Sequence, residues 1–249
     1  MRHLVFHGPW KLAVEEAEPP PLPADEVRVA VHSVGVCGSD VHGYAGVNSR
    51  RQPGMVMGHE AVGVVAGVGA AVERLAPGQR VAVDPILSCG SCDLCLSGND
   101  NLCESRRIYG CVPGLAGAYA ETFDVKATNC VAFEGPAPTE WGALVEPLSV
   151  GARAARVGGI GAGDDVFVGL AEETIELQAA PLMVGERSIH GSSAYAADDF
   201  RETAAWVASA EQDLSPLIES RVDLDGLPDV FEGYARGRLD AMKTLLQLA

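Results

Sequence analysis

The sequence predicts a mainly β protein with α-helices, in which a turn-rich β-barrel is followed by helices toward the C-terminus. Short valine-rich runs separated by Pro and Gly lie at 1–35, 61–69 and 80–83, as is typical of barrels. A longer run with helical spacing follows at 139–157. With 249 residues and 47% hydrophobic content, the chain can bury a substantial core in one large domain or two unequal ones.

The first strands are predicted by alternation. The segment VRVAVHSVGV at 27–36 places three valines on one face of a strand, after a short apolar run near the N-terminus and a proline cluster. The next strand signals are AVGVVAGVG at 61–69 and RVAV at 80–83. The turn-forming residues Ala-Pro-Gly-Gln at 76–79 join them.

The middle of the chain predicts one helix and two short strands. Residues 139–157 have helical spacing, with Thr139 as the expected N-cap and Gly158 with the following glycine as the end. The apolar segments at 165–170 and 187–192 predict short strands.

Two helices are predicted toward the C-terminus. Asp198 and Asp199 open the first, which runs through FRETAAWVASA. The second follows Leu227-Pro228 and extends through 229–249. The apolar residues near helical spacing in that segment are Val230, Phe231, Tyr234 and Leu239.

Charge and composition limit the classes of partner. The formal net charge is −16, which disfavours nucleic acids and anionic membranes because both require a basic surface. A small-molecule substrate is therefore expected. The N-terminal MRHLVFHGPW lacks the apolar run of a secretory signal, and no stretch approaches eighteen apolar residues. We expect a soluble, cytoplasmic protein without membrane contact.

Four cysteines form the strongest motif. Cys89, Cys92, Cys95 and Cys103 give the spacing C-x2-C-x2-C-x7-C, which suits a structural zinc held by four thiolates. A redox C-x2-C pair or buried thiols would not explain four cysteines in so polar a segment. We expect loss of this metal to unfold the segment. The cysteines outside metal-ligand contexts, Cys111 and Cys130, are expected to be buried, reduced thiols.

A second set of possible metal ligands is scattered along the chain. Cys37, His59, Glu60 and Glu146 lie far apart, and from spacing alone each could have a separate role. Their contexts are more specific: Val36-Cys37-Gly38-Ser39-Asp40-Val41-His42, Met57-Gly58-His59-Glu60 and Glu146-Pro147-Leu148-Ser149. With these motifs the sequence resembles the zinc-dependent medium-chain dehydrogenases, closest to the polyol and sorbitol type. The resemblance covers 1–165 and 166–249 as two blocks.

The resemblance implies a fold and a catalytic zinc site. It implies a GroES-like β-barrel catalytic domain at 1–150, completed by C-terminal helices at 192–249, with a short α/β remnant of a Rossmann domain at 151–191. It implies Cys37, His59 and Glu146 as zinc ligands with one open position, which Lewis-acid catalysis requires. Glu60 would exchange with the water at that position.

The resemblance also assigns roles around this zinc. Ser39 and His42 would relay a proton to solvent. Asp40 would orient the ligating histidine, although a turn-capping role after Gly38 is an equal alternative.

The dinucleotide-binding motif of this family is missing. Members carry a strand and G-x-G-x-x-G after the Glu-Pro helix, with an acidic residue further on. Here the segment from Gly151 to Gly191 has only 41 residues, whereas one βαβ unit takes about 30. The glycine pairs at 67–69 and 161–163 lack the third glycine and are expected to serve turns. We therefore expect no cofactor-binding residues and no binding of NAD or NADP.

These expectations lead to three functional hypotheses. The favoured one is an enzyme whose zinc acts alone on a small hydroxy or carbonyl compound, by elimination, hydration, isomerisation or cyclisation. The alternatives are a zinc-dependent NAD(P) alcohol or polyol dehydrogenase, and a truncated, inactive zinc-binding homologue. We also expect a homodimer in which the strands at 166–170 and 188–192 pair across a twofold axis. A monomer with the C-terminal helices folded over these strands is the alternative.

Overall fold

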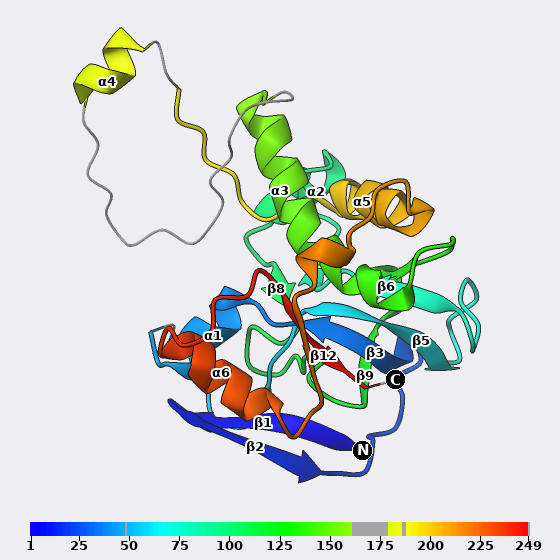
Figure 1. Cartoon of the computed structure of the whole chain (residues 1–249). Coiled ribbons are helices and arrows are strands. Elements are labelled where there is room, and N and C mark those ends of the chain that lie inside the picture. The colour runs from blue at the N-terminus through cyan, green and yellow to red at the C-terminus, as the bar shows by residue number, and fades with distance from the viewer. Residues whose placement is uncertain (48, 161–178, 186–187, 249) are drawn as a thin grey trace.

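One large sheet organises the protein in the computed structural model, which describes residues 1–47, 49–160, 179–185 and 188–248 (Figure 1). Its strands follow the order β10-β6-β5-β3-β12-β11, and β9 also pairs with β3. They are β3 (Glu26–Gly35), β5 (Glu60–Val68), β6 (Arg80–Val83), β9 (Thr122–Lys126), β10 (Cys130–Ala132), β11 (Ser220–Val222) and β12 (Thr244–Gln247). In the described part of the chain these strands do not close into a complete barrel.

The strand β3 is the centre of the sheet. One long neighbour, β5, runs antiparallel to it, while β9 pairs with its first half and β12 with its last residues. The valines at 27, 29 and 31 are all buried in the core, as their alternation predicts. The predicted strands at 61–69 and 80–83 and the turn between them are likewise confirmed.

Two smaller sheets complete the β structure. In one, β1 (Arg2–Gly8) lies between β2 (Lys11–Glu16) and β4 (Met55–Val56). In the other, β7 (Ile86–Leu87) pairs with β8 (Arg107–Ile108). The predicted fold class, mainly β with α, is confirmed.

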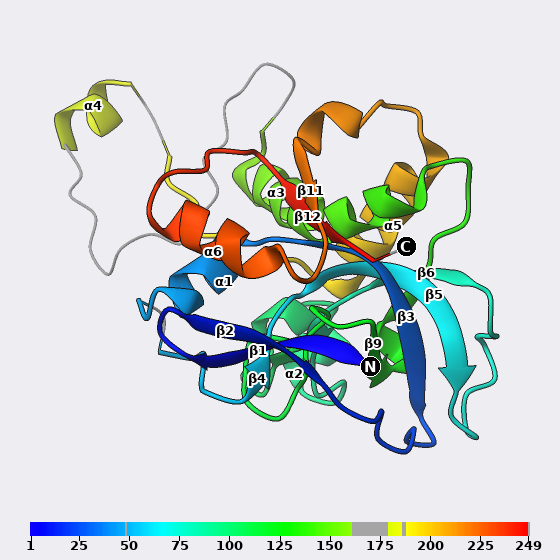
Figure 2. The same cartoon turned by 60° about the horizontal axis from the view of Figure 1, so that its bottom comes forward.

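The described residues also form α-helices. They are α1 (Gly38–Tyr44), α2 (Asp93–Leu96), α3 (Val145–Gly158), α4 (Ala179–Val184), α5 (Ala197–Ser209) and α6 (Leu227–Ala235). Figure 1 shows α3 and α5 side by side, and Arg153 of α3 pairs with Asp199 of α5 at 3.4 Å. On another side, the rings of Tyr44 in α1 and Phe231 in α6 stack edge to face. In Figures 1 and 2, α4 lies apart from the packed elements.

The helix predicted over 139–157 has a different start. Residues Thr139–Leu144 form a 3₁₀ helix, and α3 begins only at Val145. Thr139 does not cap it, because the backbone reaches α-helical hydrogen bonding a turn and a half later. The predicted end is confirmed: Gly159 has the left-handed backbone that terminates helices.

The long C-terminal helix is wrong beyond Ala235. The α6 helix ends there, Gly237 has a positive φ of 63°, and the last described residues form β12. The physical reason is pairing: Leu245 and Leu246 are fully buried where β12 adds to β3. An apolar Leu-Leu pair fits a central strand as well as a helix. The strand β11, parallel to β12, was also not predicted.

The strand predicted over 187–192 is wrong for Ser188–Ser192. These residues form no ladder and are exposed, and a strand without a partner has no hydrogen bonds to hold it. The segment 165–170 and Arg187 lie outside the described residues. The homodimer stays a prediction.

Among the described residues, every helix is too short or too polar to cross a membrane.

The buried carboxyl group of Asp84 makes the stability of the folded state depend on pH. Asp84 follows β6 and accepts a hydrogen bond of 3.0 Å from the backbone N–H of Ile86. Burial, together with the charge of Asp100, raises its pKa from 3.8 to about 7 although the Ile86 N–H and Arg201 oppose this. An ionised Asp84 therefore disfavours the folded state.

We predict that Asp84→Asn removes this cost. In the wild type the penalty grows as the pH rises from about 4 to about 7 and is complete above that range. The variant should gain on the order of a few kcal/mol in the free energy of unfolding at pH 8, and nothing at pH 4. Urea unfolding across this range measures the difference, with the exposed Asp198→Asn as a control for the lost charge. Equal curves for wild type and Asp84→Asn would contradict it.

Candidate metal centres

The four-cysteine lobe, residues 89–103, brings all four predicted ligands together. One atom from each of Cys89, Cys92, Cys95 and Cys103 lies within 4.8 Å of the others. The Sγ atoms of Cys92 and Cys95 are 3.5 Å apart, those of Cys89 and Cys95 3.8 Å, and all are free thiols. The N–H groups of Ser91 and Cys92 lower the pKa of Cys89 to about 6. Four thiolates at this spacing fit a tetrahedral zinc.

The lobe has little apolar core of its own. Leu96 is 73% exposed and Leu102 is 45% exposed. The short helix α2 is a single turn, and no residue of it is buried. Bonds to a metal are therefore the main interaction available to hold the four cysteines in place.

The second centre lies where the end of β3 pairs with the start of β5. The β3–β5 pairing sets Gly35 opposite Glu60, and Cys37 follows two residues later as the N-cap of α1. Atoms of Cys37, His59 and Glu60 lie within 4.8 Å of one another. A thiolate, an imidazole and a carboxylate are a donor set that fits catalytic zinc. We call Cys37, His59, Glu60 and Glu146 the open site.

Two glycines allow the side chains of the open site to lie close together. A Cβ on Gly35 would lie 1.9 Å from Oε2 of Glu60, so only glycine leaves room for the carboxylate. Gly58, just before His59, has a φ of +95°, and a Cβ there would come within 2.9 Å of the Tyr119 ring. Both glycines are thus required by the position of the ligands beside them.

A buried ion network orients His59. The carboxyl group of Asp40 is fully buried; it accepts a bond of 2.6 Å from Arg51 and one of 3.1 Å from the Tyr119 hydroxyl. Its Oδ2 lies 3.3 Å from Nδ1 of His59, which leaves Nε2 for a ligand. Asp40 therefore contacts the histidine and makes no capping bond to α1.

Opposite charges in this network stabilise one another. Burial alone would raise the pKa of Asp40, but His59 and Arg51 lower it to about 2. Burial likewise opposes charge on His59, while Cys111, Asp40 and Cys37 raise its pKa.

Sequence reasoning missed Lys243. Its Nζ lies 2.9 and 2.8 Å from the two carboxylate oxygens of Glu60, and 3.4 Å from the carbonyl oxygen of Val36. Burial opposes its charge, but Glu60 raises its pKa. Lys243 lies directly before β12, so interpreting that segment as a strand beside β3 would have placed it here.

Glu146 lies beside the compact group but is not part of it. It occupies the first turn of α3 and is half-buried. Burial raises its pKa to about 7, with Glu60 adding to the rise and His59 and Lys243 opposing it. The charge of Glu60 therefore acts on Glu146.

The two predicted relay residues lie at different depths. The Ser39 hydroxyl is 3.4 Å from Sγ of Cys37. His42 lies on α1 with its side chain exposed to solvent.

The two remaining cysteines are buried free thiols, as predicted. Cys130 lies in the core. Cys111 is more than a core residue, because its Sγ lies 3.2 Å from Arg51 and 3.6 Å from Nδ1 of His59. No spacing rule pointed to this contact.

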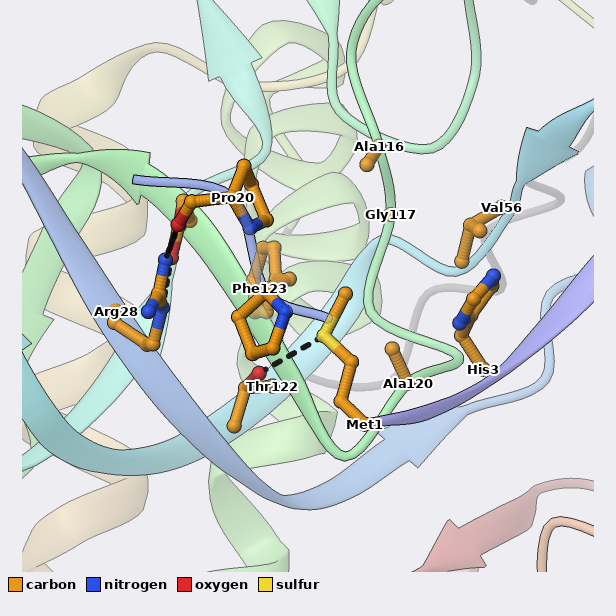
Figure 3. A pocket seen from close by; sticks show the side chains of 12 residues that line it. Met1, His3, Pro20, Arg28, Val56, Ala116, Gly117, Ala120, Thr122 and Phe123 are labelled. Carbon is orange, nitrogen blue, oxygen red and sulfur yellow. Dashed lines mark hydrogen bonds and ion pairs between the residues drawn. The ribbon is translucent and has the colours of Figure 1, made fainter. Parts of the chain in front are cut away.

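A separate cavity of about 120 Å³ lies near the N-terminus and contains none of the candidate ligands (Figure 3). It is lined by His3, Val56, Phe123 and their neighbours, with the Thr122 hydroxyl donating to Met1 Sδ at 3.1 Å. Its walls are largely apolar. This cavity is therefore distinct from both metal centres.

A domain family and several curated proteins match parts of the chain. The model of the alcohol dehydrogenase GroES-like domain matches residues 23–135. Sorbitol dehydrogenase of Homo sapiens is 41% identical over 170 residues, which are 66% of this chain and 47% of that protein. The starvation-sensing protein RspB of Escherichia coli is 37% identical over 153 residues, 61% of this chain and 44% of that protein. The chain spans about half the length of these curated relatives.

Solved structures share the fold. Galactitol-1-phosphate dehydrogenase from Escherichia coli aligns with a TM-score of 0.87 and 21% identity, over 100% of both chains. The 2R,3R-butanediol dehydrogenase from Bacillus subtilis aligns with a TM-score of 0.84 and 20% identity, over 100% of this chain and 99% of that one. An alcohol dehydrogenase from E. coli in complex with NADH gives a TM-score of 0.85 and 23% identity, over 100% and 99%.

The domain match, the curated relatives and the shared fold agree with one another: the chain carries an alcohol dehydrogenase GroES-like domain at residues 23–135 and is similar to sorbitol dehydrogenases and to zinc-binding dehydrogenases.

Proposed function

We propose that the protein is a zinc-dependent enzyme of the alcohol and polyol dehydrogenase type, acting on a hydroxyl group of a small molecule. The observation that carries this proposal is the open site: Cys37, His59 and Glu60 converge, and Asp40 fixes the histidine. A set of three protein donors, as at catalytic zinc sites, distinguishes this centre from the closed four-cysteine set. Relatives named for sorbitol and L-idonate oxidation support the substrate class.

Each residue of the site has a proposed role. Cys37 and His59 would hold the zinc together with a carboxylate: Glu60 converges with them in the structure, and Glu146 is the ligand that the resemblance implies. When bound, zinc acts as a Lewis acid that acidifies a substrate hydroxyl or polarises a carbonyl. Ser39 lies near enough to Cys37 to take the hydroxyl proton at its Oγ, and the exposed His42 would pass a proton to solvent.

Lys243 and the Asp40 network would keep the site ordered. Lys243 contacts both carboxylate oxygens of Glu60 and would keep this carboxylate beside the other donors. Arg51 neutralises Asp40, and the buried pair keeps the imidazole of His59 at one orientation.

The comparisons favour the dehydrogenase hypothesis over chemistry without nicotinamide. Two neighbours are described as bound to NADH and to NADP, which does not support the expectation that NAD(P) is absent. Hydride transfer requires such an acceptor. A nucleotide-binding part of the protein belongs to this proposal. The division into domains at 1–150, 151–191 and 192–249 is proposed as well.

We predict oxidation of a polyol with NAD or NADP. Purified, zinc-loaded protein is incubated with each nucleotide and with sorbitol, L-idonate, 2,3-butanediol or galactitol 1-phosphate, and reduced nicotinamide is measured by absorbance. The Cys37→Ser variant, which removes a zinc donor, should lose at least about 100-fold in rate. Substrate conversion without nucleotide would instead favour the redox-free hypothesis, and no conversion with no nucleotide binding would favour an inactive zinc-binding homologue.

We predict two zinc ions per chain, one in each centre. Metal analysis of the wild type should give a stoichiometry near two, and Cys37→Ser should lower it to near one while the fold, followed by circular dichroism, is retained. A wild-type stoichiometry near one that Cys37→Ser leaves unchanged would mean that the open site holds no zinc.

The four-cysteine lobe should respond to mutation in the opposite way. Because Leu96 and Leu102 of the lobe are exposed, Cys95→Ser should lower the free energy of unfolding by several kcal/mol and lower the melting temperature. Thermal unfolding with zinc and with a chelator measures this. Unchanged stability after loss of zinc from the lobe would contradict it.

A further inference from the structure

A further group of possible metal ligands lies around Nδ1 of His59. One atom from each of Asp40, His59 and Cys111 lies within 4.8 Å of the others, and all three residues are buried. We call these three residues the inner site. It shares His59 with the open site, but its carboxylate and its thiol are different ones.

The distances within the inner site are those of a tetrahedral zinc site. Oδ2 of Asp40 lies 3.3 Å from Nδ1 of His59, and Sγ of Cys111 lies 3.6 Å from the same nitrogen. Zinc bonds of about 2.1 Å to nitrogen and oxygen and about 2.3 Å to sulfur, at tetrahedral angles, separate such ligand atoms by about 3.4 Å and about 3.6 Å. The three side chains are therefore spaced as ligands of one ion.

The guanidinium group of Arg51 already supplies a positive charge at the inner site. Its Nη2 lies 2.6 Å from Oδ1 of Asp40 and 3.2 Å from Sγ of Cys111, and its Nη1 donates to the carbonyl oxygen of Cys111 at 2.8 Å. The Arg51 side chain is 2% exposed. A guanidinium stays charged and carries no free lone pair, so it neutralises the carboxylate without binding a metal itself. Arg51 thus contacts two of the three residues that a bound ion would contact.

The fold makes room for this arginine. Gly43 of α1 lies against its stem, and a Cβ there would come within 2.2 Å of Cγ of Arg51. The Nε of Arg51 is buried and has no hydrogen-bond partner among the described residues. An unpaired buried donor is costly, which indicates that Arg51 is kept here for its charge rather than for a complete set of hydrogen bonds.

We propose that the inner site is a latent zinc position that Arg51 keeps closed. A metal ion would have to displace the guanidinium from Asp40 and from Cys111. While Arg51 is in place, Nδ1 of His59 faces Asp40 and its Nε2 stays available to the open site. The competing explanation is that Arg51 is only the counter-ion of Asp40 and that Cys111 only fills the core. The inner site does not require zinc at the open site, so it goes beyond the proposed function.

The substitution Arg51→Leu tests the proposal, because it removes the charge and introduces no ligand. After incubation with excess zinc and gel filtration to remove loosely bound ions, Arg51→Leu should hold one more zinc per chain than the wild type. The double variant Arg51→Leu/Cys111→Ser should lose this additional ion. Cys111→Ser alone should leave the stoichiometry of the wild type unchanged, since no zinc reaches that thiol while Arg51 is present.

The matched control is Arg28→Leu. Arg28 pairs with Asp124 at 2.7 Å in another partly buried ion pair. Among the described residues, Asp124 belongs to none of the groups of three possible ligands. Arg28→Leu should therefore add no zinc. A similar gain in Arg28→Leu, or a gain in Arg51→Leu that Cys111→Ser does not remove, would assign the ion to exposed acidic groups and overturn the proposal.

Cobalt identifies the ligand directly. With Co²⁺ in place of zinc, the spectrum of Arg51→Leu minus that of the wild type should contain an additional thiolate-to-cobalt charge-transfer band. This band should be absent when Cys111→Ser is combined with Arg51→Leu. A difference spectrum without a Cys111-dependent band would contradict the inner site as a metal position.

Thermal unfolding measures whether an ion can replace the guanidinium. Without added metal, Arg51→Leu should melt at a lower temperature than the wild type, because the charge of Asp40 is left buried and unpaired. Added zinc should raise the melting temperature of Arg51→Leu but not that of the double variant. If Arg51→Leu stays unfolded even with excess zinc, the ion does not take the place of Arg51 and the proposal is wrong.

These results are distinguishable from failure of the proposed function. If the wild type holds no Cys37-dependent zinc but Arg51→Leu gains one Cys111-dependent ion, only the proposed function falls. If the wild type holds its Cys37-dependent zinc and Arg51→Leu gains none, only this inference falls.

Discussion

The burial of one negative charge, on Asp40, constrains the whole region around the open site. A carboxylate cannot lie in the interior without opposite charge and hydrogen bonds, and removing a partner from such a pair typically costs about 3–5 kcal/mol. The partners come from distant parts of the sequence: Arg51 follows α1, His59 directly precedes β5 and Tyr119 precedes β9. Loops that would otherwise move independently are therefore fixed relative to β3. The precision of the metal donors is a consequence of this pairing.

The two centres depend on the fold in opposite ways. The open site is assembled by the sheet, since the β3–β5 register and the bare backbone of Gly35 bring Glu60 toward Cys37. The four-cysteine lobe is a loop that its own metal would order. Yet the lobe also reaches outward, through Asp100 and Asn101, to the segment that precedes α5. A centre that is purely local in the sequence thus has bonds to a distant part of the chain.

Local pattern was sufficient for much of the fold and for the first ligands. Alternating valines identified β3, and β-branched runs with a Pro-Gly turn identified β5 and β6. The cysteine spacing identified the lobe. What the sequence could not show depended on pairing between distant segments. Leu245 and Leu246 fit a helix until β3 is known to lie beside them, and Lys243 becomes part of the site only through that strand. Arg51 and Cys111 have no local pattern; burial beside Asp40 and His59 defines them.

The pairing of β12 with β3 has a consequence for how the family can vary in length. The contact of Lys243 with Val36 joins residues 207 positions apart, so the sheet closes a very long loop of chain. The entropy lost on closing a loop grows only with the logarithm of its length, and each doubling costs about 0.6 kcal/mol. A relative about twice as long would close the same sheet at nearly the same cost, provided its extra residues fold by themselves. Evolution can therefore lengthen or shorten the connection between α3 and α5 widely while the strands at its two ends keep their register.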